Sequence, residues 1–195
     1  MFYIFSRWVV RTVLTFLYRV KVYGLEHEPP DGPVILCSNH RSNLDPPLVA
    51  CYLQRKVHFM AKAELFNIPG FSHLIRHYGA FPVTRGGMNM ETLKNAIQIV
   101  KQGNMLVIFP EGTRQKSGKL GEGKKGAASI ALRGGAKIFP VAVIGEYKLF
   151  RPMKVVYGKP FDAAEAVAGE PSAKQGDVLT EKIMSSIQQL LDEYS

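Results

Sequence analysis

The stretch PVILCSNHRSNLDPP, residues 33–47, decides the fold of this chain. It opens with an apolar run, Pro33 to Asn39, which is typical of a buried β-strand. It closes with Asp45 followed by two prolines. Asp45 suits the N-cap of a helix and Pro46 suits the first helical position, so this end predicts a helix start. A buried strand, a polar loop and a helix in succession indicate an α/β fold.

The rest of the chain continues this alternation of short apolar runs and helical patterns. The further predicted strands are Lys56–Ala61, Ala80–Val83, Met105–Pro110, Lys137–Gly145 and Lys154–Gly158. The predicted helices are Pro46–Gln54, Glu64–His77 with an interruption at Pro69-Gly70, Met88–Lys101, Lys124–Arg133 and Asp177–Tyr194. Such alternation predicts a central, largely parallel (mixed) sheet flanked by helices. In sheets of this kind, ligands bind beyond the carboxyl ends of the strands.

Length and composition agree with one such domain. The chain has 195 residues, of which 46% are hydrophobic and 21% charged, and these values are typical of a folded globular protein. We expect an N-terminal helix at residues 1–22 and a single α/β domain at 23–195. The cysteines, Cys37 and Cys51, form no CxxC pair and no disulfide framework, which favours a reducing cytoplasm.

The charge balance indicates an anionic partner. The formal net charge is +9 and the isoelectric point is near 9.6. Nucleic acid, a phosphate-bearing substrate and an anionic membrane would each fit this charge. A nucleic-acid surface would interleave basic residues with aromatic ones, whereas the aromatic residues here lie mainly in apolar stretches. We therefore expect no nucleic acid among the partners.

The N-terminal segment predicts a basic amphipathic helix. Its polar residues recur every four positions and form one stripe on a helix: Arg7, Arg11, Thr15 and Arg19. The longest uncharged run, Thr12 to Tyr18, is far shorter than the roughly 20 residues of a spanning helix. The pattern favours a helix that lies in the plane of an anionic membrane, and a core helix with a narrow solvent face is the alternative. We expect peripheral or monotopic attachment to the cytoplasmic face of the cell membrane.

His40 and Asp45 are candidates for a catalytic pair. Residues five apart are about 140° apart around a helix, so the two side chains need a turn between them to meet. A loop that ends with Asp45 at a helix N-cap supplies such a turn. There the carboxylate would fix the tautomer of His40 and stabilise the imidazolium that forms when the ring takes a proton. In the alternative, Asp45 only caps the helix and His40 is an ordinary loop residue.

Cations follow three predicted strands. FPEGTR, residues 109–114, contains Gly112, which allows close approach of the backbone to a ligand, and Arg114, which can hold a phosphate through two hydrogen bonds. Arg85 and Lys62 follow two other strands. Each could be a solvated surface residue, but three cations at three strand ends predict convergence on one phosphate-binding crevice.

Two further patterns are weaker. GKLGEGKK, residues 118–125, nearly matches the phosphate loop of nucleotide-binding proteins but lacks the Ser or Thr that would hold magnesium. His73 and His77 share a helix face but lack the glutamate of a zinc hydrolase and a third ligand. We therefore expect no metal and no bound cofactor.

Four blocks of sequence carry a resemblance to a known family. They are NHRSNLD at 39–45, GAFPVTRG at 79–86, FPEGTR at 109–114 and IFPVAV at 138–143. In order and spacing they resemble the four motifs of the glycerolipid acyltransferases, most closely the bacterial 1-acyl-sn-glycerol-3-phosphate acyltransferases. The likeness runs from about residue 20 to about residue 160.

The resemblance implies a reaction and a set of site residues. The enzyme would move a fatty acyl group from acyl-CoA or acyl-acyl carrier protein to the sn-2 hydroxyl of lysophosphatidic acid, forming phosphatidic acid in phospholipid biosynthesis. His40 would be the general base and Asp45 its orienter. The residues implied to bind the acceptor and its phosphate are Lys62, Arg85, Glu111, Gly112 and Arg114.

Two rival functions stay open at this point. The acceptor could be another lysophospholipid or glycerol 3-phosphate. Alternatively, the chain could be a non-catalytic protein that binds anionic lipids, although such a protein would not need a His–Asp pair beside a phosphate site.

Overall fold

One mixed sheet forms the centre of the molecule. The computed structural model describes residues 2–83, 89–115 and 119–195. The strands are β1 (Lys21–Tyr23), β2 (Val34–Ser38), β3 (Val57–Lys62), β4 (Ala80–Val83), β5 (Met105–Ile108), β6 (Lys137–Ile144), β7 (Lys154–Tyr157) and β8 (Phe161–Asp162). Their order is β1-β7-β6-β2-β5-β3-β4, and β8 also pairs with β6. Pairing is parallel except at β6–β7 and β6–β8. The predicted α/β domain with a largely parallel sheet is confirmed.

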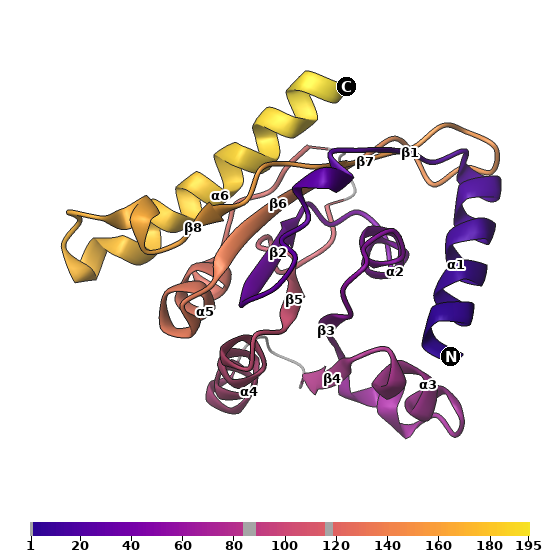
Figure 1. Ribbon diagram of the computed structural model, residues 1–195, viewed down its shortest axis with the longest axis horizontal. Coiled ribbons are helices and arrows are strands. Elements are labelled where there is room, and N and C mark those ends of the chain that lie inside the picture. The colour runs from indigo at the N-terminus through magenta and orange to yellow at the C-terminus, as the bar shows by residue number, and fades with distance from the viewer. Residues whose placement is uncertain (1, 84–88, 116–118) are drawn as a thin grey trace.

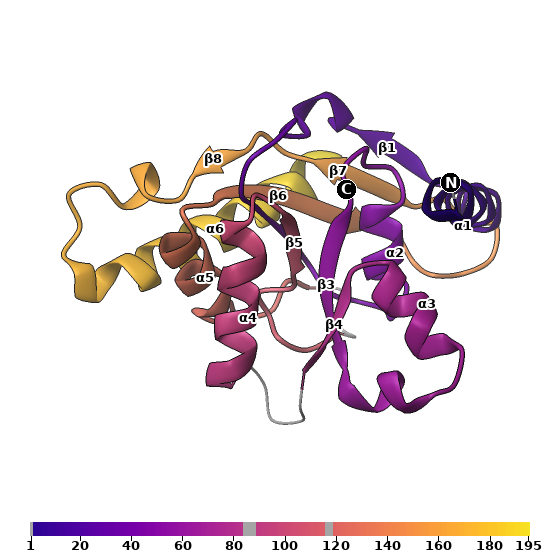
Figure 2. The same ribbon diagram turned by 60° about the horizontal axis from the view of Figure 1, so that its bottom comes forward.

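Helices cover both faces of this sheet (Figure 1). They are α1 (Phe2–Tyr18), α2 (Asp45–Ala50), α3 (Phe71–His77), α4 (Met90–Lys101), α5 (Gly126–Gly134) and α6 (Ser172–Tyr194), with short 3₁₀ helices η1 (Leu25–His27), η2 (Ala63–Asn67) and η3 (Glu165–Val167). Helices α4, α5 and α6 lie on one face, whereas α2 lies on the other between the sheet and α1 (Figures 1 and 2).

The central strand β2 shows why the sheet needs two layers of helices. Its side chains alternate between two apolar clusters: Val34 and Leu36 pack with α2, while Ile35 and Cys37 pack with α4, α5 and α6. All of them are fully buried. A strand that is buried on both faces reads as a continuous apolar run, which is the pattern that predicted it.

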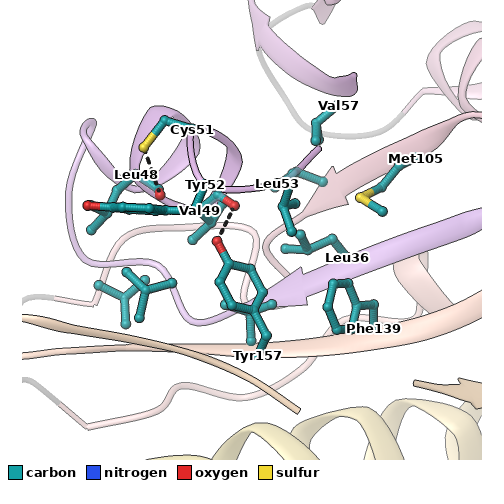
Figure 3. Packing of buried hydrophobic residues seen from close by; sticks show 14 of the residues in the cluster. Leu36, Leu48, Val49, Cys51, Tyr52, Leu53, Val57, Met105, Phe139 and Tyr157 are labelled. Atoms are coloured by element: carbon teal, nitrogen blue, oxygen red, sulfur yellow. Dashed lines mark hydrogen bonds between the residues drawn. The ribbon is translucent and has the colours of Figure 1, made fainter. Parts of the chain in front are cut away.

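Tyr157 of β7 fixes α2 against the sheet. Its ring stacks on Phe139 with a centroid separation of 5.6 Å, and its hydroxyl donates to the carbonyl oxygen of Val49 at 2.9 Å (Figure 3). Burial raises the pKa of Tyr157 well above its usual value, so the hydroxyl keeps its proton as a donor. This contact holds α2, and with it Asp45 at the start of that helix, in place over the sheet.

Most element boundaries lie within two residues of the predicted ones, but some helix ends differ by more. Helix α2 ends at Ala50 rather than Gln54, and α6 begins at Ser172 rather than Asp177. Strands β1 and β8 were not predicted, because strands of two or three residues carry too little pattern. The predicted helix at 64–77 is divided into η2 and α3 around Pro69-Gly70, as the predicted interruption indicates.

The arginines of α1 face the protein, contrary to the expectation that they would meet headgroups. Arg7 donates from Nη1 to the carbonyl oxygens of Leu53 at 2.5 Å and Gln54 at 3.0 Å, and the Arg11 guanidinium lies 5.3 Å from the centre of the Tyr52 ring. The backbone carbonyls between α2 and β3 supply the physical reason, because they give Arg7 hydrogen-bond acceptors within the protein itself.

The outward face of α1 is apolar. Its exposed large side chains are Ile4, Phe5, Trp8, Val9, Val13 and Phe16, several of them more than 60% exposed. The alternative of a core helix with a narrow solvent face is therefore excluded. Within the described residues, none of the helices combines the length with the apolar character that crossing a bilayer requires.

Candidate active site

His40 and Asp45 meet just beyond the carboxyl end of β2. The Nδ1 atom of His40 lies 2.8 Å from Oδ2 of Asp45. The Asp45 side chain is fully buried, and the His40 side chain is 19% exposed. Because the carboxylate accepts a hydrogen bond from Nδ1–H, the neutral ring carries its lone pair on Nε2, on the other side of the ring. This is the arrangement of a general base with an orienting carboxylate.

Asp45 is not the N-cap of α2, which corrects the sequence-based expectation. Leu44 is the N-cap and Asp45 is the first residue of the helix. The Asp45 carboxylate turns back instead, and Oδ2 accepts from the backbone N–H groups of Arg41 at 2.6 Å and Ser42 at 2.7 Å. The same oxygen that orients His40 thus holds the loop between them, which explains how residues five apart can meet.

The other oxygen of Asp45 has a partner from a distant part of the chain. Tyr147, in the loop after β6, donates its hydroxyl to Oδ1 at 2.5 Å. Burial, followed by the neighbouring Asp45 carboxylate, raises the pKa of Tyr147 far above its usual value. Tyr147 therefore stays protonated, and both oxygens of the buried carboxylate are satisfied.

Asn39 joins the same loop to β6. Its side chain donates to the carbonyl oxygen of Val143 at 2.9 Å and accepts from the N–H of Val143 at 2.8 Å. Arg41 also donates to the carbonyl oxygen of Gly145 at 2.5 Å. These contacts fasten the residues on either side of His40 to the end of β6 and the loop after it.

Glu111 lies behind the candidate base and binds backbone. Its Oε1 accepts from the N–H of His40 at 2.7 Å and its Oε2 accepts from the N–H of Gly121 at 2.8 Å. The side chain is 2% exposed. The resemblance implies an acceptor-binding region for Glu111, but both of its oxygens are occupied by backbone donors, so its contacts are those of a residue that positions His40.

An apolar cavity of about 860 Å³ opens beside His40. The His40 ring stacks on Phe109 with centroids 4.1 Å apart and an angle of 20° between the planes. The cavity extends from this pair between α2 and β3 to α3 and α1, and its wall residues include Tyr3, Val10, Pro47, Phe59, Leu65, Phe71 and Tyr78. A cavity of this size and lining suits a ligand with a long apolar part.

Two of the predicted cations lie at the same cavity. Lys62, at the end of β3, and Arg114, in the segment after β5, both line it and are both exposed. Gly112 also lines it with φ at 68°, a conformation that favours glycine, and a Cβ there would lie 3.0 Å from the Lys124 side chain. Arg85 falls outside the described residues. The structure therefore brings together His40, Asp45, Lys62, Gly112 and Arg114.

Other reactive side chains add no nucleophile to this site, although Cys51 lines the cavity. Cys37 is fully buried and burial raises the pKa of its thiol far above the usual value, while burial raises the pKa of Cys51 to about 12. Neither thiol would ionise to a nucleophile near neutral pH. His73 and His77 are exposed on α3, and within the described residues no three His, Cys, Asp or Glu side chains lie close enough to hold a metal ion.

Sequence reasoning missed the roles of Asn39 and Tyr147. Asn39 lies inside the block that contains His40, so its position next to the candidate base was the available signal. Tyr147 follows Asp45 by 102 residues and belongs to no recognised pattern. Only the pairing of β2 with β6 brings it to the site.

The chain has relatives among known proteins. A family model described as Acyltransferase matches residues 19–144. A 1-acyl-sn-glycerol-3-phosphate acyltransferase of Bacillus subtilis (strain 168) is 31% identical over 194 residues, covering 96% of this chain and 96% of that protein. The chloroplastic 1-acyl-sn-glycerol-3-phosphate acyltransferase LPAT1 of Arabidopsis thaliana is 29% identical and covers 97% of this chain. The chain spans only 54% of that plant protein, and 43% of the similar BAT2 of Brassica napus.

A solved structure shares the fold. The crystal structure of PlsC from Thermotoga maritima, a 1-acyl-sn-glycerophosphate (LPA) acyltransferase, aligns with a TM-score of 0.75 and 27% identity, covering 94% of this chain and 77% of that one. The family model covers well over half of this chain, and the matched region contains His40, Asp45 and the cations at the cavity. The predicted family is confirmed: this chain belongs to the acyltransferase family.

Proposed function

We propose that this protein transfers a fatty acyl group from an acyl thioester to the sn-2 hydroxyl of 1-acyl-sn-glycerol 3-phosphate, forming phosphatidic acid. One observation carries the proposal: Asp45 binds Nδ1 of His40, and His40 lines the same cavity as Lys62 and Arg114. The names of the Bacillus and Thermotoga relatives, both acyltransferases of 1-acyl-sn-glycerol phosphate, support the choice of acceptor.

The chemistry needs one positioned base. His40 Nε2 takes the proton of the acceptor hydroxyl while its oxygen bonds to the thioester carbonyl carbon. The carbon–sulfur bond then breaks, and the imidazolium returns the proton to the departing thiolate. A thiol with a pKa near 8.5 leaves readily, so a strong acid is not required. A positioned base contributes about 10²–10⁴ in rate.

The cations and the apolar wall account for the two ends of the acceptor. Lys62 and Arg114 would pair with its phosphate, since guanidinium and ammonium groups form charge-assisted hydrogen bonds with phosphate oxygens. The apolar lining between α2, β3 and α3 would hold acyl carbon away from water. Either acyl-CoA or acyl-acyl carrier protein would supply the thioester.

The outward apolar face of α1 would bring this site to its lipid acceptor. Phe5, Trp8 and Phe16 are each at least 60% exposed. Residues 1–25 contain no Asp or Glu, and Arg19 and Lys21 are exposed just after α1. Aromatic side chains and cations favour the interface of an anionic bilayer. Tyr3 and Val10 of α1 also line the cavity, so the helix would dock the protein with its cavity beside the membrane. The cytoplasmic face is the location we propose.

The test is phosphatidic acid formation by the purified protein. Lysophosphatidic acid and a long-chain acyl thioester are supplied, with His40→Ala in parallel and each thioester donor tried in turn. We expect turnover by the wild type and a loss of about 10²-fold or more in the variant. Equal turnover by both would remove His40 from the mechanism. If the enzyme preferred another lysophospholipid or glycerol 3-phosphate in a competition assay, that molecule would be the acceptor in place of lysophosphatidic acid.

A further inference from the structure

The loop between β6 and β7 ends in an apolar tip. Residues 145–153 read GEYKLFRPM, and the side chains of Leu149 and Phe150 are 61% and 55% exposed. Lys148 and Arg151, on either side of this pair, are exposed as well. Loop tips favour glycine and small polar residues, so two adjacent large apolar side chains in such a place call for a physical explanation.

The tip is attached to α1. The N–H of Phe150 donates to the carbonyl oxygen of Leu17 at 2.6 Å, and the N–H of Met153 donates to that of Tyr18 at 3.1 Å. The Phe150 ring meets the Phe16 ring edge-on, with centroids 5.9 Å apart. Both ribbon views show the loop beside the C-terminal end of α1 (Figures 1 and 2). Leu149 and Phe150 therefore extend the outward apolar face of α1 beyond the end of the helix.

The backbone of Phe150 is strained where its ring is exposed. Its φ is 62°, in the left-handed region that bulky side chains rarely adopt. A glycine would take this conformation without strain, yet the position carries a phenyl ring that is more than half exposed. Strain of this kind at an exposed site is a reason to look for a function of the side chain.

The charges around the tip favour an anionic bilayer as its partner. Arg19 and Arg151 are exposed beside it, and the acidic residue of the loop, Glu146, pairs with Lys148 at 2.8 Å. Exposed aromatic and aliphatic side chains bordered by cations are typical of surfaces that enter the headgroup layer. The partner must also deliver substrate to a cavity that α1 lines, and a lipid surface does so directly.

We propose that Leu149 and Phe150 form a second membrane-docking element that inserts into an anionic lipid surface together with the outward face of α1. This inference rests on the proposed docking of α1 and adds a part of the chain far from it in sequence. Two contact points would fix the orientation of the domain on the bilayer, which a single in-plane helix does not do. Tyr147, which donates to Asp45, belongs to the same loop, so the bilayer contact and the candidate dyad share one segment.

The test is binding of the full chain to vesicles of phosphatidylcholine and phosphatidylglycerol. The variant combines Leu149→Ser with Phe150→Asn, because asparagine tolerates the left-handed conformation and removes the ring. The matched control is Met90→Ser, since Met90 is 63% exposed at the start of α4, on the other side of the sheet. We expect the partition coefficient of the tip variant to fall about tenfold or more, while Met90→Ser binds like the wild type. Unchanged binding of the tip variant would overturn the proposal.

A second measurement reports insertion directly. The chain has a single tryptophan, so Trp8→Phe combined with Leu149→Trp places one fluorophore at the tip. We expect a blue shift of its emission with vesicles and quenching by brominated lipids. An emission spectrum that does not shift would overturn the proposal. The proposal would also fail if the Leu149→Ser, Phe150→Asn variant bound vesicles like the wild type but differed from it in oligomeric state in the absence of lipid.

These experiments are independent of turnover. If Phe5→Ser with Phe16→Ser loses vesicle binding and the tip variant keeps it, α1 docks and the tip does not. If the tip variant loses binding although the wild type forms no phosphatidic acid, the docking element stands and only the proposed reaction fails.

Discussion

Tyr147 and Asp45 are joined by a hydrogen bond of 2.5 Å, in which the tyrosine hydroxyl donates to the carboxylate oxygen that does not contact His40. Oδ2 of Asp45 accepts from His40, Arg41 and Ser42, so Oδ1 depends on Tyr147 among the described side chains. The Tyr147 ring packs edge-on against Tyr18 at the end of α1, with centroids 5.4 Å apart. Tyr147 therefore links the carboxylate of the candidate dyad to the N-terminal helix.

Tyr147→Phe should slow turnover without weakening acceptor binding. The variant leaves one oxygen of a buried carboxylate without its donor, and a hydrogen bond to a charged group contributes about 1.5–3 kcal/mol. We expect Asp45 to hold His40 less firmly in its catalytic position, and kcat to fall about ten- to hundredfold for that reason. Where the contact with His40 persists, the carboxylate has lost a donor that offset its charge and favours the imidazolium more strongly. The acid limb of the kcat/KM profile should move to higher pH, as a pH–rate series can measure. A variant with unchanged kcat and an unchanged profile would show that Tyr147 only packs.

Asp45→Asn should move the same profile in the opposite direction. The side-chain oxygen of asparagine can still accept from Arg41 and Ser42, so the loop should keep its shape. The imidazolium loses its negative partner, and the acid limb should move to lower pH while kcat falls about 10²-fold or more. Thermal unfolding of the variant checks that the fold survives. A shift to higher pH would contradict the assigned role of Asp45.

The fold could be predicted from sequence because both faces of β2, β5 and β6 are covered. Strands of this kind become continuous apolar runs, and Val34 to Ser38 and Met105 to Ile108 were recognised for that reason. Which face of α1 turns toward the protein and which toward solvent could not be predicted. A stripe of arginines is equally compatible with headgroups and with the backbone carbonyls that Arg7 binds.

The candidate site was predictable only where the chemistry is local in sequence. His40 and Asp45 lie in one loop, and Arg114 follows a clear strand. Tyr147 reaches Asp45 through strand pairing alone. The contacts of Glu111 could not be predicted, because it binds the backbone N–H groups of His40 and Gly121, and a pattern of side chains does not show backbone contacts.

Glu111→Gln should reduce stability and kcat while leaving acceptor affinity intact. Both carboxylate oxygens accept from backbone N–H groups, and the amide of glutamine presents a donor to one of them. A buried donor left unpaired costs about 1–3 kcal/mol, so we expect a lower unfolding free energy and a displaced His40. Denaturant unfolding and steady-state kinetics give the two values. A large rise in the KM for lysophosphatidic acid with unchanged stability would instead place Glu111 in the acceptor site.

The stability of the protein should fall as the pH drops below about 6.5, in part because of His58. Burial, and then the charge of Lys56, lowers the pKa of His58 in the folded protein. The unfolded chain therefore binds the proton at a higher pH than the folded one, and acid favours unfolding from the unfolded-state pKa downward. Chemical denaturation from pH 7.5 to 5.5 measures this trend. His58→Gln should flatten it, and an equally steep decline in that variant would remove His58 as a cause.

Arg114→Ala should weaken the binding of phosphate-bearing acceptors selectively. Arg114 is exposed at the cavity, so its hydrogen bonds to phosphate compete with water, and we expect the KM for lysophosphatidic acid to rise about tenfold with a smaller change in kcat. Lys62→Ala should behave similarly, because the two cations line the same cavity. The control is an acceptor that lacks phosphate, such as a monoacylglycerol, whose slow turnover should be nearly equal in wild type and variant. Equal losses on both acceptors would mean that Arg114 shapes the cavity, and the cation that recognises phosphate would then have to be sought elsewhere in the site.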